Sequence, residues 1–141
     1  MIAILLCGKD EQERILISRD CRKRIAQGSD QELRFEKAAS DIELLQAAKE
    51  EKLIHMLYYS FQKGQDLKGL RVFREQYSGT MVMLIADPSV SPLEYLRPGI
   101  APDSLLLRPL DGEKLSAVNG EFLGYPARNG VAYLKVFQAQ I

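Results

Sequence analysis

Runs of apolar residues alternate along this chain with segments in which apolar residues recur at helical spacing. Continuous apolar runs are typical of strands buried on both faces, and helices between such strands indicate a parallel sheet covered on both sides. The pattern therefore predicts a doubly wound α/β domain. We expect five strands, at residues 2–7, 31–37, 53–60, 80–86 and 104–108.

The segments between these strands carry the signals of helices and their ends. Asp10 is suited to cap the first helix, and Gly28 is suited to end it. Ser40 or Asp41 should cap the second. The expected helices follow each strand in turn, at about residues 10–27, from residue 40 or 41, at about 67–77, at about 90–97 and from about 111.

The last part of the chain departs from this alternation. Asn119 and Gly120 interrupt the final helical pattern, and further turn signals precede an apolar run at residues 131–137. We expect residues 120–123 and 131–137 to form a hairpin-like pair of strands. The chain would then divide into a domain at 1–120 and a β extension, or the start of a truncated output domain, at 121–141. Unpaired strands favour pairing with another strand, so the residues expected at an interface here are Val131, Tyr133 and Phe137.

Composition and charge narrow the classes of function. A chain of 141 residues with 46% hydrophobic content suits one compact core. Basic and acidic residues number 19 each, so no broad positive field is present to bind nucleic acid directly. The apolar start is short and meets Lys9 at once, which indicates a strand and not a signal peptide. No run is long enough to span a bilayer. We expect a cytoplasmic protein that binds neither membranes nor nucleic acid.

Few residues offer reactive chemistry. Cys7 and Cys21 are predicted to be buried free thiols, and His55, the only histidine, lies within an apolar run. No clustered metal ligands, paired catalytic carboxylates or phosphate-binding loop accompany them. We therefore expect no metal, no cofactor and no enzymatic activity.

Three local features carry a resemblance to a known family. They are Ala-Ser-Asp-Ile-Glu-Leu-Leu at residues 39–45, Asp-Leu-Lys-Gly-Leu at 66–70, and the pair formed by residues 95–100 and Leu-Leu-Leu-Arg-Pro at 105–109. In this order, over roughly residues 1–120, they resemble the receiver domain of response regulators, most of all those receivers that precede LytTR-type DNA-binding domains. The resemblance implies a CheY-like, flavodoxin-like parallel sheet in the order 2-1-3-4-5 and a role in two-component signal transduction or a phosphorelay.

The same resemblance shows which chemistry is missing. Receivers carry an acidic pair after the first strand, an aspartate at the end of the third, a hydroxyl residue at the end of the fourth and a lysine after the fifth. The corresponding positions here are Gly8 and Lys9, with Asp10 just beyond; Tyr59, Ser60 or Phe61; Ile85 or Ala86; and Arg108. Aspartyl phosphate formation needs a nucleophilic carboxylate and a metal ion. We therefore expect a pseudo-receiver that works without phosphorylation.

Two questions stay open from the sequence. Lys9 and Arg108 could together attract an anion at the carboxyl ends of the strands, or Lys9 could face solvent while Arg108 pairs with Asp10 or Asp87. The function could be contact with a protein partner or dimerisation, or instead the binding of a ligand or nucleotide by a small flavodoxin-like protein. The first surface to consider for protein contacts comprises Val90, Leu93, Tyr95, Leu96 and Leu115. The alternative, favoured for most of these residues, is that they only cover the sheet.

Overall fold

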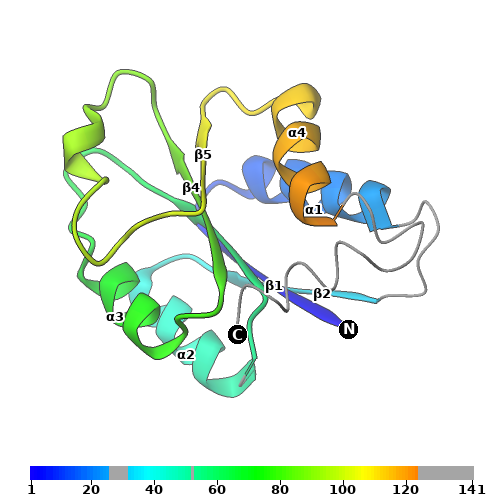
Figure 1. Cartoon of the computed structure of the whole chain (residues 1–141), viewed down its shortest axis with the longest axis horizontal. Coiled ribbons are helices and arrows are strands. Elements are labelled where there is room, and N and C mark those ends of the chain that lie inside the picture. Colours follow the sequence, from blue (N-terminus) through cyan, green and yellow to red (C-terminus); the bar gives the residue numbers. More distant parts are fainter. Residues whose placement is uncertain (26–31, 52, 124–141) are drawn as a thin grey trace.

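The computed structural model describes residues 1–25, 32–51 and 53–123. Its centre is a five-stranded parallel sheet in the order β2-β1-β3-β4-β5 (Figure 1). This order and the α/β class confirm the prediction. The strands are β1 (Ile2–Cys7), β2 (Leu33–Ala38), β3 (Met56–Ser60), β4 (Met81–Ala86) and β5 (Ser104–Leu107).

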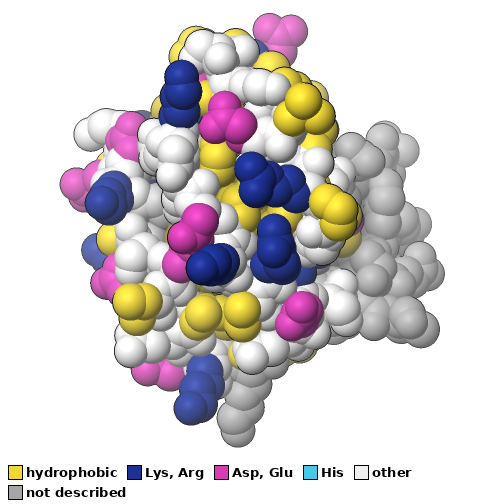
Figure 2. Space-filling model, turned by 90° about the vertical axis from the view of Figure 1, so that its left-hand side faces the viewer, with side chains coloured by type: hydrophobic (Ala, Val, Ile, Leu, Met, Phe, Trp, Pro, Cys, Tyr) yellow, Lys and Arg dark blue, Asp and Glu magenta, His cyan; other side chains and the backbone are white. Residues whose placement is uncertain are grey.

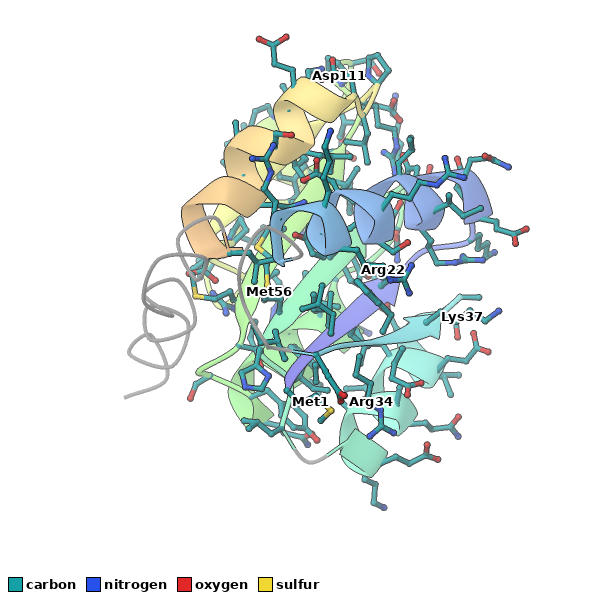
Figure 3. All side chains as sticks on the ribbon, turned by 90° about the vertical axis from the view of Figure 1, so that its right-hand side faces the viewer. Met1, Arg22, Arg34, Lys37, Met56 and Asp111 are labelled. Atoms are coloured by element: carbon teal, nitrogen blue, oxygen red, sulfur yellow. The ribbon has the colours of Figure 1, made fainter. Side chains whose placement is uncertain are left out.

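Helices cover both faces of the sheet. On one face α1 (Glu11–Ile25) and α4 (Gly112–Leu123) lie side by side, as Figure 3 shows, and pack on side chains such as Ile4 and Met83. On the other face α2 (Asp41–Glu51) and α3 (Lys68–Gln76) cover side chains such as Leu5. Every residue of β1 and β3 is buried, which explains why these strands read as continuous apolar runs.

The ends of the first two helices follow the predicted caps. Asp10 Oδ1 accepts the backbone N–H of Gln12 at 2.9 Å and that of Glu13 at 3.3 Å. At α2, Ser40 Oγ accepts from the N–H of Glu43 at 3.3 Å, and Glu43 Oε2 accepts from the N–H of Ala39 at 2.7 Å. The arrangement is a variant of the capping box, in which Glu43 accepts from the residue before the cap and not from Ser40 itself. The predicted end of the first helix at Gly28 lies outside the described residues.

The helix expected at about residues 90–97 is largely absent. Only a single 3-10 turn, η1 (Pro92–Glu94), occurs there, capped by the side chain of Ser91. Proline at the first turn starts a helix well, but Pro98 and Gly99 follow within one further turn, and Gly99 adopts a positive φ of 86°. The segment between β4 and β5 is therefore mostly irregular chain.

The last helix is longer than predicted, because Asn119 acts in the core and does not break the helix. Its Oδ1 accepts the hydroxyl of Tyr58, and its Nδ2 donates to Asp20 Oδ2 at 2.8 Å. Ser116 Oγ also donates to Asp20, at 2.9 Å. These bonds tie α4 to α1 and β3, and the helix continues to Leu123.

The strand predicted at residues 120–123 is consequently wrong, since these residues are helical. The predicted boundary between residues 120 and 121 falls inside this helix. The partner strand at 131–137, with Val131, Tyr133 and Phe137, lies outside the described residues.

His55 is buried immediately before β3, with 2% of its surface exposed. Its Nδ1 accepts the backbone N–H of Ala3 at 3.0 Å, and the backbone N–H of His55 donates to the carbonyl of Ala3 at 3.0 Å. Burial lowers the pKa of His55 below its ordinary 6.5, and the N-terminal ammonium lowers it further. The native fold therefore favours the neutral ring.

We expect stability to fall as the pH drops below 6.5, the ordinary histidine pKa. The unfolded chain takes up a proton at that pH, whereas the folded chain resists it, so protons favour unfolding. The free energy of unfolding, measured by urea titration between about pH 7.5 and 5.5, where carboxylates stay ionised, should decrease. In a His55→Asn variant, whose side-chain oxygen can accept the same Ala3 amide, this decrease should be absent. An equal decrease in both proteins would contradict the assignment.

Candidate functional site

The carboxyl ends of β1, β3 and β5 bring together Gly8, Ser60 and Arg108, which the resemblance to receivers singled out. β1 lies between β2 and β3, so the chain changes direction across the sheet at this point. Open α/β sheets bind ligands outside the carboxyl ends of their strands at such a reversal. Gly8 and Ser60 meet at this edge, and Arg108 reaches Ser60 from the end of β5.

Gly8 packs directly against β3 and leaves no room for a side chain. Its N–H donates to the carbonyl of Ala38 at 2.8 Å, which holds its backbone in line with β2. A Cβ atom built at position 8 would lie 2.7 Å from the Cβ of Ser60, closer than real Cβ contacts allow. Any side chain at this position would require Ser60 to shift, so the packing as well as the sequence opposes a carboxylate here.

Of the three candidates at the end of β3, only Ser60 faces the site. Tyr59 and Phe61 are buried in the core beneath α2 and α3, where Phe61 packs edge-on against Tyr95 at 5.7 Å between ring centroids. At the end of β4, Ile85 and Ala86 are both buried and present no hydroxyl group. Burial raises the pKa of Tyr59 above its ordinary value, and a hydrogen bond to Asp41 raises it further, so its phenol stays protonated.

Arg108 is the most connected side chain of the site, with 15% of its surface exposed. Its Nε donates to Glu13 Oε2 at 2.6 Å, its Nη1 donates to the carbonyl of Phe61 at 3.2 Å, and its Nη2 donates to Ser60 Oγ. Its Nη1 also lies 3.5 Å from Asp87 Oδ2. Of the two partners suggested by the sequence, Asp87 is confirmed, but Asp10 is occupied as a helix cap. Arg108 therefore makes no joint anion site with Lys9.

Glu13 is the residue that the sequence reasoning missed. It lies in the first turn of α1, where an acidic residue is explained by the helix dipole alone. In the fold it also points to the end of β3, where its Oε1 accepts from Ser60 Oγ at 3.3 Å. Glu13 and Arg108 together neutralise each other where a receiver-type site would hold a metal and a phosphoryl group. Among the described residues, no three potential ligands gather in a way that could hold a metal ion.

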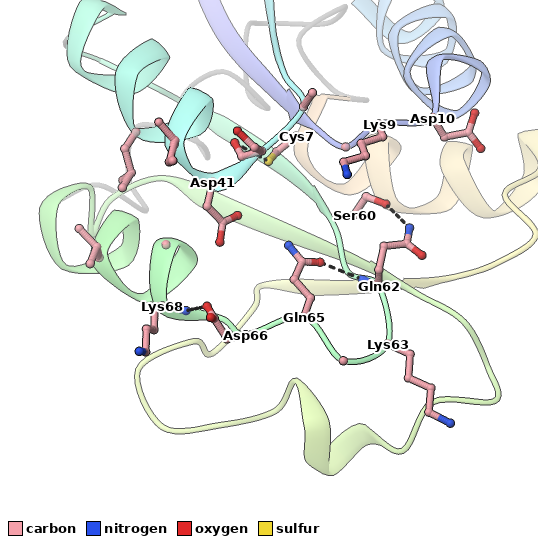
Figure 4. A pocket seen from close by; sticks show the side chains of 18 residues that line it. Cys7, Lys9, Asp10, Asp41, Ser60, Gln62, Lys63, Gln65, Asp66 and Lys68 are labelled. Carbon is pink, nitrogen blue, oxygen red and sulfur yellow. Dashed lines mark hydrogen bonds between the residues drawn. The ribbon is translucent and has the colours of Figure 1, made fainter.

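A cleft of about 1080 Å³ opens beside this network, between the ends of β1 and β3 and helices α2 and α3 (Figure 4). Lys9 and Ser60 line one side of it, and Ile42 and Val72 line the other. Cys7 lies at its base. Burial raises the pKa of the Cys7 thiol to about 12, and the nearby Asp41 and Glu43 add to this shift. The thiol is therefore protonated and unreactive at neutral pH.

Only two of the five residues suggested for protein contacts are exposed to solvent. Val90, Tyr95 and Leu115 are 4% exposed or less and belong to the core, so they are corrected from interface to packing residues. Leu93 and Leu96 are exposed, at 81% and 50%. On the face that carries α3 and η1, Figure 2 shows hydrophobic side chains separated by charged ones. Leu105 and Leu107 on the edge strand β5 are also partly exposed.

Comparison with known proteins supports the fold. No family model and no curated protein matches the sequence. Solved structures do match. The chemotaxis protein CheY4 of Vibrio cholerae superposes with a TM-score of 0.65 at 16% identity, over 84% of this chain and 95% of that one. The receiver domain of NtrX from Brucella abortus gives 0.66 at 15% identity, over 86% and 98%. A response regulator receiver domain protein from Clostridium thermocellum gives 0.65 at 14% identity, over 86% and 93%.

The chain thus has the CheY-like fold of response regulator receiver domains. At these identities the likeness is one of fold. In the part of the chain that the structure describes, no helix has both the length and the apolar character needed to cross a bilayer.

Proposed function

We propose that this chain is a pseudo-receiver, a signalling module of a two-component-type transcription regulator that acts through protein contacts and without phosphorylation. In this proposal it is a binding module and not an enzyme, it works in the cytoplasm, and it accompanies or derives from a regulator of the LytTR class. One observation carries the proposal. The strand ends at which a receiver would bind metal and phosphate hold Gly8, Ser60 and an Arg108–Glu13 ion pair instead.

This arrangement supports a fixed site and not a switch. In a receiver, a cation after the last strand is available to pair with a phosphoryl group. Here Arg108 already has a carboxylate partner at 2.6 Å and further contacts with Ser60 and Phe61. A phosphoryl group would have to displace Glu13 and would approach without a metal ion to neutralise its oxygens. In this proposal, Arg108 is therefore already fully paired within the protein and does not serve as a partner for a phosphoryl group.

We expect the chain to take up no phosphoryl group when it is incubated with acetyl phosphate and Mg²⁺. Among the described residues, Ser60 hydrogen-bonds to no carboxylate other than the ion-paired Glu13, and no carboxylate ends β3. Intact-mass spectrometry at neutral pH should show no added phosphate, and Mg²⁺ should not raise the melting temperature. A conventional receiver treated in parallel serves as the positive control. Stoichiometric acid-labile phosphate on this chain would refute the proposal.

The exposed leucines of η1 and the following loop are the part of the surface best suited to a partner. Leu93 and Leu96 are 81% and 50% exposed. Exposed leucines favour association because contact removes apolar surface from water. Separately, β5 is an edge strand, and its outer backbone groups have no neighbouring strand in the described sheet. In this proposal the partner is a second copy of the chain or another protein.

A Leu93→Lys, Leu96→Lys double variant should reduce self-association without unfolding the domain. Sedimentation velocity of the wild type should show a mass that rises with concentration, and the dissociation constant of the variant should increase by tenfold or more. Leu53→Lys is the matched control. Leu53 is similarly exposed, at 47%, but it precedes the amino end of β3 and is not part of η1 or the loop after it. A wild type that stays monomeric up to about 100 µM would exclude self-association and leave a different protein as the partner.

A further inference from the structure

The cleft between α2 and α3 has an apolar wall. Ile42 and Val72, from the two helices, are 72% and 38% exposed although both are hydrophobic. Leu45 lies on the same wall and is partly buried. Helices α2 and α3 can approach each other closely here because Gly69 of α3 has no side chain. A Cβ atom at position 69 would lie 2.4 Å from the Cβ of Asp41. The volume, about 1080 Å³, is in the range of pockets that hold drug-sized ligands.

Polar groups from the strand ends, the start of α2 and the loop before α3 line the rest of the cleft, and its three carboxylates accept hydrogen bonds. Asp10 caps α1, Asp66 Oδ1 accepts from the N–H of Lys68 at 3.1 Å, and Asp41 Oδ1 accepts from the hydroxyl of Tyr59 at 2.7 Å. Gln65 Nε2 donates to the same hydroxyl at 2.7 Å, which fixes the floor of the cleft.

The lysines of the cleft are not engaged in this way. The side chains of Lys9, Lys63 and Lys68 all line it, and none of the three ammonium groups makes a hydrogen bond or an ion pair with the described residues. Figure 4 shows Lys9 turned into the cleft on the side of Ser60, whereas Lys63 and Lys68 point outward at its rim. Asp10, Asp41 and Asp66 equal the three lysines in number, so the positive charge that the cleft offers is local, at the Lys9 ammonium group. The cleft combines this local charge with an apolar wall.

We infer that this cleft is a binding site for a small organic anion with an apolar body. The apolar body lies against Ile42, Leu45 and Val72, and its carboxylate, sulfonate or phosphate group faces Lys9. The amides of Gln62 and Gln65 also line the cleft, but they bond to the protein: Gln62 Nε2 donates to Ser60 Oγ at 3.4 Å, and Gln65 Oε1 accepts the backbone N–H of Gln62 at 3.0 Å. The inference is independent of phosphorylation and of self-association.

Two fluorescent probes that differ by a single charged group test this inference on the full chain. Anilinonaphthalene sulfonate has an apolar aromatic body and a sulfonate, and N-phenylnaphthylamine has the same body without the sulfonate. In low-salt buffer the sulfonate probe should bind saturably, with one site per chain, and more tightly than the neutral probe. Lys9→Gln should weaken the sulfonate probe by about fivefold or more and leave the neutral probe unchanged. Val72→Glu should weaken both.

Matched variants and a structural readout make each outcome decisive. Lys23→Gln removes an exposed lysine of α1 outside the cleft, and Leu93→Glu removes an exposed leucine elsewhere, so neither should change probe affinity. Amide chemical shifts of the complex should change at the cleft and nowhere else, and unchanged melting temperatures of the variants exclude binding to a loosened fold. If Lys9→Gln binds the sulfonate probe as tightly as the wild type does, the inference that the ligand is an anion is wrong. Unsaturable binding, or loss of binding in Leu93→Glu instead of Val72→Glu, would overturn the site itself.

Discussion

Replacing Asn119 with leucine should lower the free energy of unfolding by about 3 kcal/mol, because it leaves buried polar groups without partners. Asn119 is fully buried and joins the hydroxyl of Tyr58 to the carboxylate of Asp20. Leucine fills nearly the same volume, so the loss reports the hydrogen bonds and not a cavity. Burial raises the pKa of Tyr58 well above its ordinary value, so its hydroxyl keeps its proton and still needs an acceptor. Urea denaturation followed by far-UV circular dichroism measures the change.

Two controls separate this network from general damage to α4. Ser116→Ala removes only one of the bonds to Asp20, so it should cost about 1 kcal/mol. A Tyr58→Phe, Asn119→Leu double variant removes both partners of one bond, and its cost should be smaller than the sum of the two single variants. Additive costs would show that Tyr58 and Asn119 act independently, against the structure.

Replacing Arg108 with methionine should destabilise the fold by about 2 kcal/mol, since it leaves Glu13 and Ser60 without their cation. Methionine keeps an unbranched apolar stem, so the change isolates the guanidinium. Both members of the Arg108–Glu13 pair are largely buried, at 15% and 13% exposure. This is more than the roughly 1 kcal/mol expected for a partly exposed surface pair. The melting temperature and the urea midpoint give the measurement.

Arg34→Met is the matched control for Arg108. Arg34 pairs with Glu36 at 3.4 Å, but both side chains are well exposed, at 52% and 39%, and its loss should cost less than about 0.5 kcal/mol. Arg108→Lys should recover only part of the stability, because one ammonium group cannot reach Glu13, Ser60 and the Phe61 carbonyl in the geometry of the fork. Full recovery with lysine would show that the charge alone matters.

The sheet could be predicted from the sequence because its signal is local. β1 and β4 are apolar throughout, and apolar runs bounded by helical patterns leave few alternatives to a parallel sheet. The capping residues Asp10 and Ser40 were likewise found from their neighbours in the chain. The positions of Gly8 and Arg108 at the strand ends followed from the family resemblance.

The features that the sequence did not predict depend on contacts between distant segments. Asparagine is unfavourable inside a helix, and the bonds of Asn119 to Tyr58 and Asp20 explain why α4 continues past it. The partnership of Glu13 with Arg108 spans 95 positions of the chain, and nothing in the local pattern of α1 distinguishes Glu13 from its acidic neighbours. Tyr95 and Val90 were placed on the surface because the short segment around them was expected to be a helix with an exposed face.

The tight contact at Gly8 restricts how this chain could evolve. The Cβ atom of any side chain at position 8 would lie 2.7 Å from the Cβ of Ser60, and an aspartate at position 60 would enter beside the carboxylate of Glu13. Each single substitution toward a metal-binding site is therefore opposed by a residue already present. Recovery would require several changes at once, with no selectable benefit from the first. If the proposal of a pseudo-receiver holds, a single substitution at position 8 or 60 should therefore not introduce Mg²⁺-dependent phosphorylation into this chain.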